Sequence, residues 1–473
     1  MYTRREITTQ ERIQQREYCE MIKQAIAHRP HYAVVDTYGC QQNESDSEIL
    51  RGWLTECGYI ITDDTAKADL VAVNTCAVRE HAELRVLGNV GALAHNKEKN
   101  PDLIVCVGGC MTQQETVKEK IKNSFRMVDL VFGPHEVWQF PELVWQTMER
   151  HGRRGNKSRL ISAQPSEGVI AEELPRRRDS SIKAWLSIMN GCDNFCSYCI
   201  VPYVRGRERS RRPDDILAEA KELAAQGYKD ITLLGQNVNS YGKGLEEGID
   251  FPDLLKALDD IDGDFILRFM TSHPKDATEK LFRVMGESEK CAHHIHLPLQ
   301  SGSDRILKAM NRHYDRAKYL EKVAQARKYM PDLVLTTDIL VGFPGETEED
   351  FKDTLSLVEE VGFDAMFTFI YSPRTGTPAA KLPDPVTRAE KQVWFDELLA
   401  VANRISGEKH AAYVGKTYRV LVDGVTNDPA HNLSARTKGG RLVHMSGDAA
   451  LVGQFADAKI TGSSTWALFG ELA

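Results

Sequence analysis

The chain has 473 residues, of which 42% are hydrophobic and 27% are charged, and its net charge is −8. This composition is ordinary for a folded globular protein, and the length predicts two to four domains. The acidic balance excludes a uniformly basic nucleic-acid-binding protein, so any contact with nucleic acid must come from a local patch of charge.

The first 30 residues are predicted to form an N-terminal extension. They carry acids and bases without an apolar centre, so they are neither a signal peptide nor an acid-poor transit peptide. No apolar run in the sequence approaches the ~20 residues that span a bilayer. We therefore expect a cytoplasmic protein with no membrane partner. In such a protein, ten cysteines indicate metal binding or catalysis rather than a disulfide framework.

Residues 31–150 alternate between strand and helix patterns and are predicted to form the first domain. Apolar runs predict strands at 31–40, 69–76, 103–110 and 127–133. The segment 43–59 has helical periodicity, and Thr112 is a candidate cap for the helix after the third strand. Repeated βα units predict an α/β domain with a parallel, flavodoxin-like sheet.

Three of these predicted strands end in a cysteine, namely Cys40, Cys76 and Cys110. The carboxyl ends of parallel strands lie along one edge of a sheet, so we expect the three thiols to meet there. One interpretation is that they are ordinary buried thiols of the core. Their common register favours the other, a 4Fe-4S cluster held by three cysteines with one iron left open. The other four cysteines are predicted to be structural, because Cys57 lies in a helical segment, Cys106 lies within a strand, and Cys19 and Cys291 lack companions at ligand spacing.

Regular patterning fades over residues 151–180, which are predicted to be a linker. Residues 181–408 then repeat the strand and helix pattern six times. The strands are predicted at 184–189, 230–234, 265–270, 293–297, 333–340 and 365–371. Six such units predict a partial (βα)6 barrel, whose active site is expected at the carboxyl ends of the strands.

A short loop after the first of these strands holds three more cysteines, Cys192, Cys196 and Cys199. Their Cys-x3-Cys-x2-Cys spacing brings the thiols onto one small object. Soft thiolates select zinc or an iron–sulfur cluster, and both usually take four ligands. Since the local set stops at three, a zinc site needs a fourth ligand from elsewhere, whereas a 4Fe-4S cluster keeps one iron open to a small molecule.

Basic residues gather in two later stretches. Five arginines lie within residues 205–212, where they suit a phosphate backbone unless neighbouring acids pair with them. Residues 409–473 show strand-like alternation with glycine-containing turns, which predicts a small all-β barrel of a kind that often binds oligonucleotides. In that barrel Arg436, Lys438 and Arg441 are candidates for contact with phosphate.

Several motifs together resemble one family. They are TYGCQQNESDSE (37–48), GCDNFCSYCIVPYVRGRERSR (191–211), LLGQNVNSYG (233–242), MTSHPKD (270–276), HLPLQSGSDRILKAMNRHY (296–314), DILVGFPGETEEDF (338–351) and YSPRTGTPAA (371–380). The chain from about residue 31 is thereby similar to the MiaB-type tRNA methylthiotransferases of the radical S-adenosylmethionine (SAM) superfamily. The resemblance implies a methylthiotransferase domain, a radical SAM barrel and a C-terminal TRAM domain.

The resemblance also implies the reaction, which adds a methylthio group to carbon 2 of N(6)-isopentenyladenosine at position 37 of tRNA. The partners it implies are the tRNA anticodon stem-loop, an external electron donor and a sulfur source. Cys192, Cys196 and Cys199 are expected to hold the 4Fe-4S cluster that cleaves SAM. Cys40, Cys76 and Cys110 are expected to hold the auxiliary 4Fe-4S cluster, whose open iron carries the sulfur. Residues expected to bind SAM are Tyr198, Gln236, Ser272, Gln300, Arg312, Asp338 and Gly342.

Among these residues the resemblance gives Arg312 the role of counter-ion to the SAM carboxylate, and Asp338 and Gln300 that of acceptors for its ribose hydroxyls. The backbone near Tyr198 and Gly342 is expected to face the adenine.

Three alternatives remain open on the sequence. The nearest is a sister methylthiotransferase acting on threonylcarbamoyladenosine in tRNA or on a ribosomal-protein aspartate, although TYGCQQN and LLGQNVNSYG favour the isopentenyladenosine branch. A second is an iron–sulfur electron carrier, which would not need the polar residues that follow the predicted strands, among them Gln236, Ser272 and Gln300. A third is a zinc-binding RNA adaptor.

Overall fold

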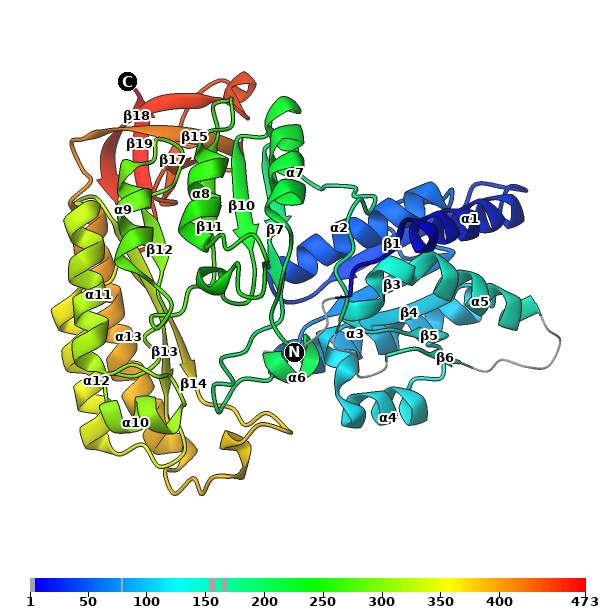
Figure 1. The fold of residues 1–473 in the computed structure, drawn as a ribbon, viewed down its shortest axis with the longest axis horizontal. Coiled ribbons are helices and arrows are strands. Elements are labelled where there is room, and N and C mark those ends of the chain that lie inside the picture. The colour runs from blue at the N-terminus through cyan, green and yellow to red at the C-terminus, as the bar shows by residue number, and fades with distance from the viewer. Residues whose placement is uncertain (1–4, 78–79, 153–158, 164–167) are drawn as a thin grey trace. The chain divides into compact units, whose positions relative to one another are not determined.

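The computed structural model describes residues 5–77, 80–152, 159–163 and 168–473, with the backbone alone for 80–84. Figure 1 shows the ribbon coloured along the chain. The chain divides into two compact units, each described below by itself. Unit 1 comprises Met1–Asp179, Asn190–Asp193 and Ile200–Arg209, and unit 2 comprises Ser180–Met189, Asn194–Cys199 and Ser210–Ala473.

Unit 1 is built on a six-stranded parallel sheet in the order β2-β1-β3-β4-β5-β6. Its strands are β1 (Tyr32–Thr37), β2 (Ile60–Ile61), β3 (Leu70–Thr75), β4 (Ile104–Gly109), β5 (Leu130–Val131) and β6 (Leu160–Ile161). Its helices are α1 (Thr9–Ala25), α2 (Gln41–Glu56), α3 (Glu80–Lys99), η1 (Cys110–Gln113), α4 (Glu115–Ser124), η2 (Pro134–Gln139), α5 (Phe140–Gly152) and α6 (Val201–Val204). The order of the first five strands is the flavodoxin-like order, which confirms the predicted fold of this part.

The N-terminal residues form a helix that the sequence analysis did not predict. In α1 the Thr8 side chain accepts a hydrogen bond from the Glu11 amide, and Glu11 answers the Thr8 amide in a capping box. The helix packs against α5 and α2. There Cys57 Sγ lies 3.2 Å from Cys19 Sγ, and both cysteines are buried.

Two other local expectations are wrong. Strand β6 lies inside residues 151–180, whose predicted linker also includes residues outside the described ranges. Thr112 does not cap α4, because it lies inside η1 and its hydroxyl donates to the carbonyls of Gly109 and Phe132 at 2.8 and 2.6 Å. The residue before α4 is Gln114, which makes no side-chain cap.

Unit 2 contains a partial barrel formed by two three-stranded parallel sheets, β11-β10-β7 and β12-β13-β14. A parallel bridge between Leu267 and Cys291 joins the first sheet to the start of the second. The strands are β7 (Lys183–Ser187), β10 (Asp230–Leu234), β11 (Ile266–Phe269), β12 (His294–His296), β13 (Val334–Val341) and β14 (Ala365–Ile370). These are the six strands predicted from the sequence, and they confirm the partial (βα)6 barrel.

Helices between these strands and after the last of them cover the outside of the partial barrel (Figure 1). They are α7 (Pro213–Ala225), η3 (Val238–Ser240), α8 (Phe251–Asp259), α9 (Glu279–Glu287), α10 (Asp304–Ala309), α11 (Arg316–Tyr329), α12 (Glu348–Val361), η4 (Ala379–Lys381) and α13 (Arg388–Ala411). A two-stranded sheet pairs β8 (Met189–Asn190) with β9 (Arg209–Ser210).

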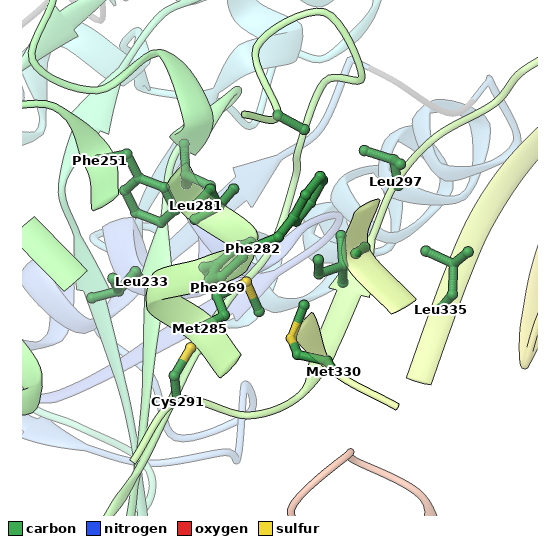
Figure 2. Packing of buried hydrophobic residues seen from close by; sticks show 14 of the residues in the cluster. Leu233, Phe251, Phe269, Leu281, Phe282, Met285, Cys291, Leu297, Met330 and Leu335 are labelled. Atoms are coloured by element: carbon green, nitrogen blue, oxygen red, sulfur yellow. The ribbon is translucent and has the colours of Figure 1, made fainter. Parts of the chain in front are cut away.

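Apolar side chains from these strands and helices form the largest core of the chain (Figure 2). Phe251 from α8 meets Phe269 from β11 edge to face, with ring centroids 5.1 Å apart. Phe282 and Met285 from α9 are fully buried beside them, and Cys291 is buried in the same cluster. The prediction of a structural role for Cys291 agrees with this position. This core fixes the positions of the strands whose polar ends are described below.

The C-terminal residues form a closed five-stranded barrel in the order β15-β16-β17-β19-β18, as predicted. Its strands are β15 (Thr417–Val425), β16 (Leu433–Thr437), β17 (Leu442–Met445), β18 (Phe455–Ser463) and β19 (Leu468–Leu472), with η5 (Ala449–Leu451) before β18. No helix within the described residues is long and apolar enough to cross a membrane.

Candidate active site with two sets of cysteines

In unit 1 the three predicted cysteines follow the carboxyl ends of neighbouring strands. Cys40 comes three residues after β1 and directly before α2, Cys76 directly follows β3, and Cys110 directly follows β4. Each cysteine therefore lies just past the end of its strand, whereas the sequence analysis placed it at the last position of the strand. Strands β1, β3 and β4 are adjacent in the sheet, so the three residues share one edge.

The Asn43 side chain marks the point where these thiols converge. Its Oδ1 atom lies 3.7 Å from Cys40 Sγ and 3.9 Å from Cys110 Sγ. Burial raises the pKa of the Cys110 thiol to about 12, the Arg205 guanidinium lowers it, and the thiols of Cys40 and Cys76 raise it further.

Two glycines let the backbone approach this point. Gly39 has φ +128°, and a Cβ there would stand 2.3 Å from Cys76 Cβ and 3.0 Å from its Sγ. Gly109 has φ +96°, and a Cβ there would stand 2.4 Å from the Thr75 carbonyl oxygen. Only glycine fits both the conformation and the space. The strand ends are thereby packed tightly enough to bring cysteines from three strands to one place.

The chemistry of this donor set fits a three-cysteine iron–sulfur cluster. Three soft sulfur ligands at one sheet edge are the ligands that such clusters use. No group of three His, Cys, Asp or Glu side chains in the described ranges is arranged around a single metal ion. In a cubane cluster each cysteine binds a different iron, so the sulfur atoms stand around the cluster and need not converge on one ion.

The second set of cysteines lies in the loop 191–199, whose parts belong to both units. In unit 1, the Cys192 amide donates to the Gly206 carbonyl at 3.2 Å. In unit 2, the Ser197 amide donates to the Met310 carbonyl and the Ser197 carbonyl accepts from the Ala379 amide, at 3.0 and 2.8 Å. The Cys199 amide donates to the Cys196 carbonyl at 3.0 Å. The loop is therefore held by backbone contacts on each side of Cys196.

Arg312 lies against this loop in unit 2 and is only 4% exposed. Its guanidinium lies 3.3 Å from Cys196 Sγ and 3.4 Å from the Tyr198 hydroxyl, and it donates to the Pro298 carbonyl at 3.0 Å. The structure therefore brings Arg312 together with Tyr198 and with Cys196, one of the predicted cluster ligands. Its predicted role as counter-ion to the SAM carboxylate remains a prediction.

Buried polar atoms without partners mark the ends of β10 and β11. The Ser272 hydroxyl, His273 Nε2, Asn237 Oδ1 and Asn239 Nδ2 have no hydrogen-bond partner among the described residues. Burial, aided by Arg312, lowers the pKa of His273 well below its usual range, so this ring is neutral. Buried polar groups are normally paired, so four such atoms on adjacent strand ends can serve as hydrogen-bond partners for a polar ligand or for water. Ser272 is one of the residues predicted to bind SAM.

Of the remaining predicted residues, Gln236 follows β10, Gln300 follows β12 and Asp338 lies within β13. Gln236 follows β10 by two residues, and Gln300 pairs its backbone with β13 through the Asp338 carbonyl at 2.8 Å. Asp338 Oδ2 lies 3.3 Å from His296 Nε2. Gln300 has φ +71°, a strained conformation that proteins retain mainly where function needs it.

Gly342 follows β13 and makes a buried turn with φ +74°. Its amide and that of Phe343 both donate to the Glu346 carboxylate, the latter at 3.1 Å. Glu346 is 2% exposed, and burial raises its pKa to about 7 against the lowering effect of these amides. The carboxylate fixes the backbone of the turn that was predicted to face adenine.

Within residues 205–212, several arginines form ion pairs with acidic residues of the same chain. Arg205 is 5% exposed and pairs with Asp46 at 2.7 Å, Arg207 pairs with Asp193 at 3.2 Å, and in unit 2 Arg211 pairs with Glu219 at 2.9 Å. The prediction of RNA contact is wrong for buried Arg205. It is also wrong for Arg441, which is 6% exposed and pairs with Asp364.

Sequence reasoning missed the side chains that support the cysteines of unit 1. Asn43 and Asp46 lie one turn apart on α2 and are both buried. The available signal was the run of polar residues after Cys40, since a polar first turn that is buried must face a polar site. His296 was also missed, because nothing in the sequence shows that it reaches Asp338.

Comparison with known proteins agrees with this geometry. Residues 186–358 match the radical SAM superfamily, residues 32–133 match the uncharacterized protein family UPF0004, and residues 411–473 match the TRAM domain. The radical SAM methyltransferase TsrM from Kitasatospora setae has a similar fold, with a TM-score of 0.54 and 15% identity over 74% of this chain and 75% of that one. The chain is therefore a radical SAM enzyme with an RNA-binding type of C-terminal domain.

Full-length relatives narrow the class further. A protein of Thermoanaerobacter sp. (strain X514) is 50% identical over 441 residues, 93% of this chain and 92% of the relative. One of Alkaliphilus oremlandii is 51% identical over 439 residues, 93% and 92% of the two chains. Both are named tRNA-2-methylthio-N(6)-dimethylallyladenosine synthase. The chain belongs to this family of tRNA methylthiotransferases, which use SAM and two 4Fe-4S clusters.

Proposed function

We propose that this protein adds a methylthio group to carbon 2 of N(6)-isopentenyladenosine at position 37 of tRNA. The observation that carries the proposal is the pairing of two three-cysteine sets in one chain, Cys40, Cys76 and Cys110 at the sheet edge of unit 1 and Cys192, Cys196 and Cys199 in the loop. The names of the relatives support dimethylallyladenosine as the substrate and do not favour threonylcarbamoyladenosine or a ribosomal-protein aspartate.

The clusters and SAM, when bound, supply the radical chemistry and the sulfur and methyl groups. The chain's own residues bind and orient them. In this proposal Cys192, Cys196 and Cys199 hold the cluster at which SAM is cleaved, and Arg312 and Tyr198 border it. The unpaired hydroxyl of Ser272 at the end of β11 offers SAM a buried hydrogen-bond partner.

The proposed SAM site is completed by Gln236 after β10, Gln300 after β12, Asp338 within β13 and the turn at Gly342 after β13. Asp338 and Gln300 provide acceptors for hydroxyl groups, and Glu346 keeps the Gly342 turn in place. In unit 1, Cys40, Cys76 and Cys110 hold the auxiliary cluster that delivers sulfur. In the proposed SAM site, groups from separate strands and the loops after them thus converge on SAM, as is usual in barrels of this kind.

The proposed partners follow from the same reaction. The substrate is the anticodon stem-loop of tRNA, which the TRAM domain match supports. The reaction also requires an external electron donor and a source of sulfur for each further turnover. The proposed place of action is the cytoplasm, where an anticodon stem-loop is accessible to a modifying enzyme.

Anaerobic incubation of the reconstituted protein with SAM, a reductant and tRNA carrying isopentenyladenosine tests the proposal. Nucleoside mass spectrometry should show a methylthio derivative of that nucleoside, and SAM with a deuterated methyl group should pass its label to the product. The same tRNA without the isopentenyl group is the matched control and should stay unchanged. Unmodified isopentenyladenosine in a protein that carries both clusters would refute the proposal.

A further inference from the structure

The side chain of Arg205 is a buried charge to which the proposed reaction gives no role. It lies at the end of α6 and is 5% exposed. Burying a guanidinium costs several kcal/mol unless good partners replace water. A buried guanidinium therefore needs partners that offset its desolvation, and these partners indicate what the charge acts on.

All the contacts recorded for this guanidinium lie at the cysteine edge of unit 1. Its Nε–H donates to Cys110 Sγ at 3.1 Å. One terminal nitrogen donates to Asp46 Oδ2 at 2.7 Å and to Asn43 Oδ1 at 2.9 Å. The guanidinium therefore bridges Cys110, a proposed cluster ligand, and the Asp46 carboxylate. Because its N–H groups are fixed in one plane, it can donate to both groups at once.

The surroundings fix this orientation from several sides. Asn43 is itself held, because its side-chain nitrogen donates to the Tyr38 carbonyl at 2.9 Å and its backbone carbonyl accepts from the Asn74 side chain at 2.9 Å. The other oxygen of Asp46 accepts from Gln42 at 3.2 Å. Apolar packing of Ile200 and Val204 against Cys110 positions α6, from which the Arg205 side chain extends.

We propose that Arg205, held by Asp46 and Asn43, is a positioning residue of the auxiliary cluster: it donates a hydrogen bond to the sulfur of Cys110 and raises the reduction potential of the cluster. The inference rests on the proposed function of the Cys40, Cys76 and Cys110 set. A cysteine that binds iron has lost its proton and only accepts hydrogen bonds, so a fixed cationic donor suits it.

The sign of the effect follows from charge. One-electron reduction adds a negative charge to the cluster without making or breaking a bond, and a nearby positive charge or a hydrogen bond to sulfur stabilises the reduced form. Removing Arg205 should therefore lower the potential. Removing the charge of Asp46 leaves the guanidinium uncompensated and should raise it.

The test isolates the auxiliary cluster in the full-length chain by replacing Cys192, Cys196 and Cys199 with alanine. In this background, Arg205→Gln, Arg205→Lys and Asp46→Asn are compared after anaerobic reconstitution. Iron and sulfide are counted, and the cluster is titrated with dithionite while the reduced fraction is followed by electron paramagnetic resonance. We expect Arg205→Gln to lower the equilibrium constant for reduction about tenfold, which is about 59 mV for one electron.

Arg205→Lys keeps the charge without the fork, so it should lower the potential by less, and Asp46→Asn should shift it the opposite way. The matched control is Arg159→Gln. The Arg159 guanidinium also lies in unit 1, but it donates to the backbone carbonyls of Val128 (2.7 Å), Ile121 (2.9 Å) and Phe125 (2.5 Å). The reduction potential of the cluster should therefore not change in this variant.

Each outcome decides the inference. An unshifted potential in an iron-loaded Arg205 variant overturns it, as does a shift of the same sign in Arg205→Gln and Asp46→Asn. If both Arg205 variants lose the cluster, an unchanged melting temperature of the iron-free protein supports the inference, and a lowered one overturns it in favour of a purely structural role. Absence of auxiliary iron in the parent chain would instead refute the proposed function.

A second readout separates this role from RNA contact. A residue that contacts phosphate contributes to the salt dependence of tRNA binding, and its loss reduces the slope by about one. Arg205→Gln should leave that slope unchanged, because the side chain is buried. A reduced slope would show that Arg205 reaches RNA and would contradict the assignment.

Discussion

Single buried polar atoms without a partner among the described residues distinguish the ends of β10 and β11 in the partial barrel. Ser272 is 4% exposed, and its hydroxyl has no partner in the described structure. The sequence shows that Ser272 follows a predicted strand, which is why it was a candidate. Its lack of a partner depends on the packing of β10 against β11, which no sequence pattern reports.

Replacing this hydroxyl tests the site at the level of one atom. Ser272→Ala should weaken SAM binding about 5- to 10-fold, the worth of one hydrogen bond, without destabilising the ligand-free protein. Calorimetric titration of the reconstituted enzyme measures the affinity. The control is Ser406→Ala, whose hydroxyl donates to the Thr465 carbonyl at 2.8 Å and which should lose stability but not affinity. Equal SAM affinity in Ser272→Ala and wild type would exclude Ser272 from the site.

Glu346 makes the stability of the barrel depend on pH. Its pKa is raised from 4.5 to about 7 by burial, so between these values the folded protein keeps a proton that the unfolded chain has released. The free energy of unfolding should therefore fall as the pH rises through this window, by up to about 3 kcal/mol.

Thermal melting of wild type and Glu346→Gln from pH 5 to pH 8 checks this expectation. The glutamine variant should gain stability relative to wild type as the pH rises, with the gain levelling off above pH 7. Glu349→Gln, at an exposed position of α12, should show no such trend. A gap between wild type and Glu346→Gln that does not depend on pH would contradict the assignment.

At the scale of elements, buried charge holds the C-terminal barrel against the radical SAM barrel within unit 2. Arg441, between β16 and β17, pairs with Asp364, and the Asp364 carboxylate also accepts from the Leu335 amide at 2.8 Å. The guanidinium lies 4.6 Å from the Tyr413 ring and 3.1 Å from His410 Nε2. The sequence predicted Arg441 as a phosphate contact because arginine in a basic turn has the same appearance whether or not an acid meets it.

Truncation of this residue should loosen the attachment. Arg441→Ala leaves the buried Asp364 carboxylate without its cation, which typically lowers the free energy of unfolding by about 3–5 kcal/mol. Arg419→Ala is the control, since its pair with Asp264 joins the same parts but is more than half exposed and should matter by less than about 1 kcal/mol. Denaturant unfolding of both variants measures the difference. Equal losses would contradict the role of the buried pair.

The long elements were predictable and the short ones were not. All six strands of the partial barrel and strands β1, β3 and β4 follow clear apolar runs, so sequence periodicity located them. Strands β2, β5 and β6 have only two residues each, too few for a period to appear, although a longer strand was predicted at 127–133 around β5. Helix α1 was missed because its interior mixes charges with few apolar residues, and tertiary contacts with α5 and α2 supply its stability.

At the scale of the whole molecule, the segment that follows the cysteine loop contributes to unit 1 rather than to the barrel. Ile200–Arg209 belongs to unit 1, where Arg205 meets Cys110. The sequence predicted both sets of cysteines from spacing and strand register. It did not predict that an arginine placed after one set supports the other, because a contact between residues 95 positions apart leaves no local pattern.

In the proposed function, the two sets of cysteines have different tasks in one methylthiolation reaction. The most direct measurement compares wild type with the variant Cys40→Ala, Cys76→Ala and Cys110→Ala, each given SAM, reductant and isopentenylated tRNA. Wild type should hold about eight iron atoms per chain and the variant about four. The variant should still release 5′-deoxyadenosine but form no methylthio nucleoside. A variant that still forms this product, or a wild type with about four iron atoms that does so, would contradict the claim.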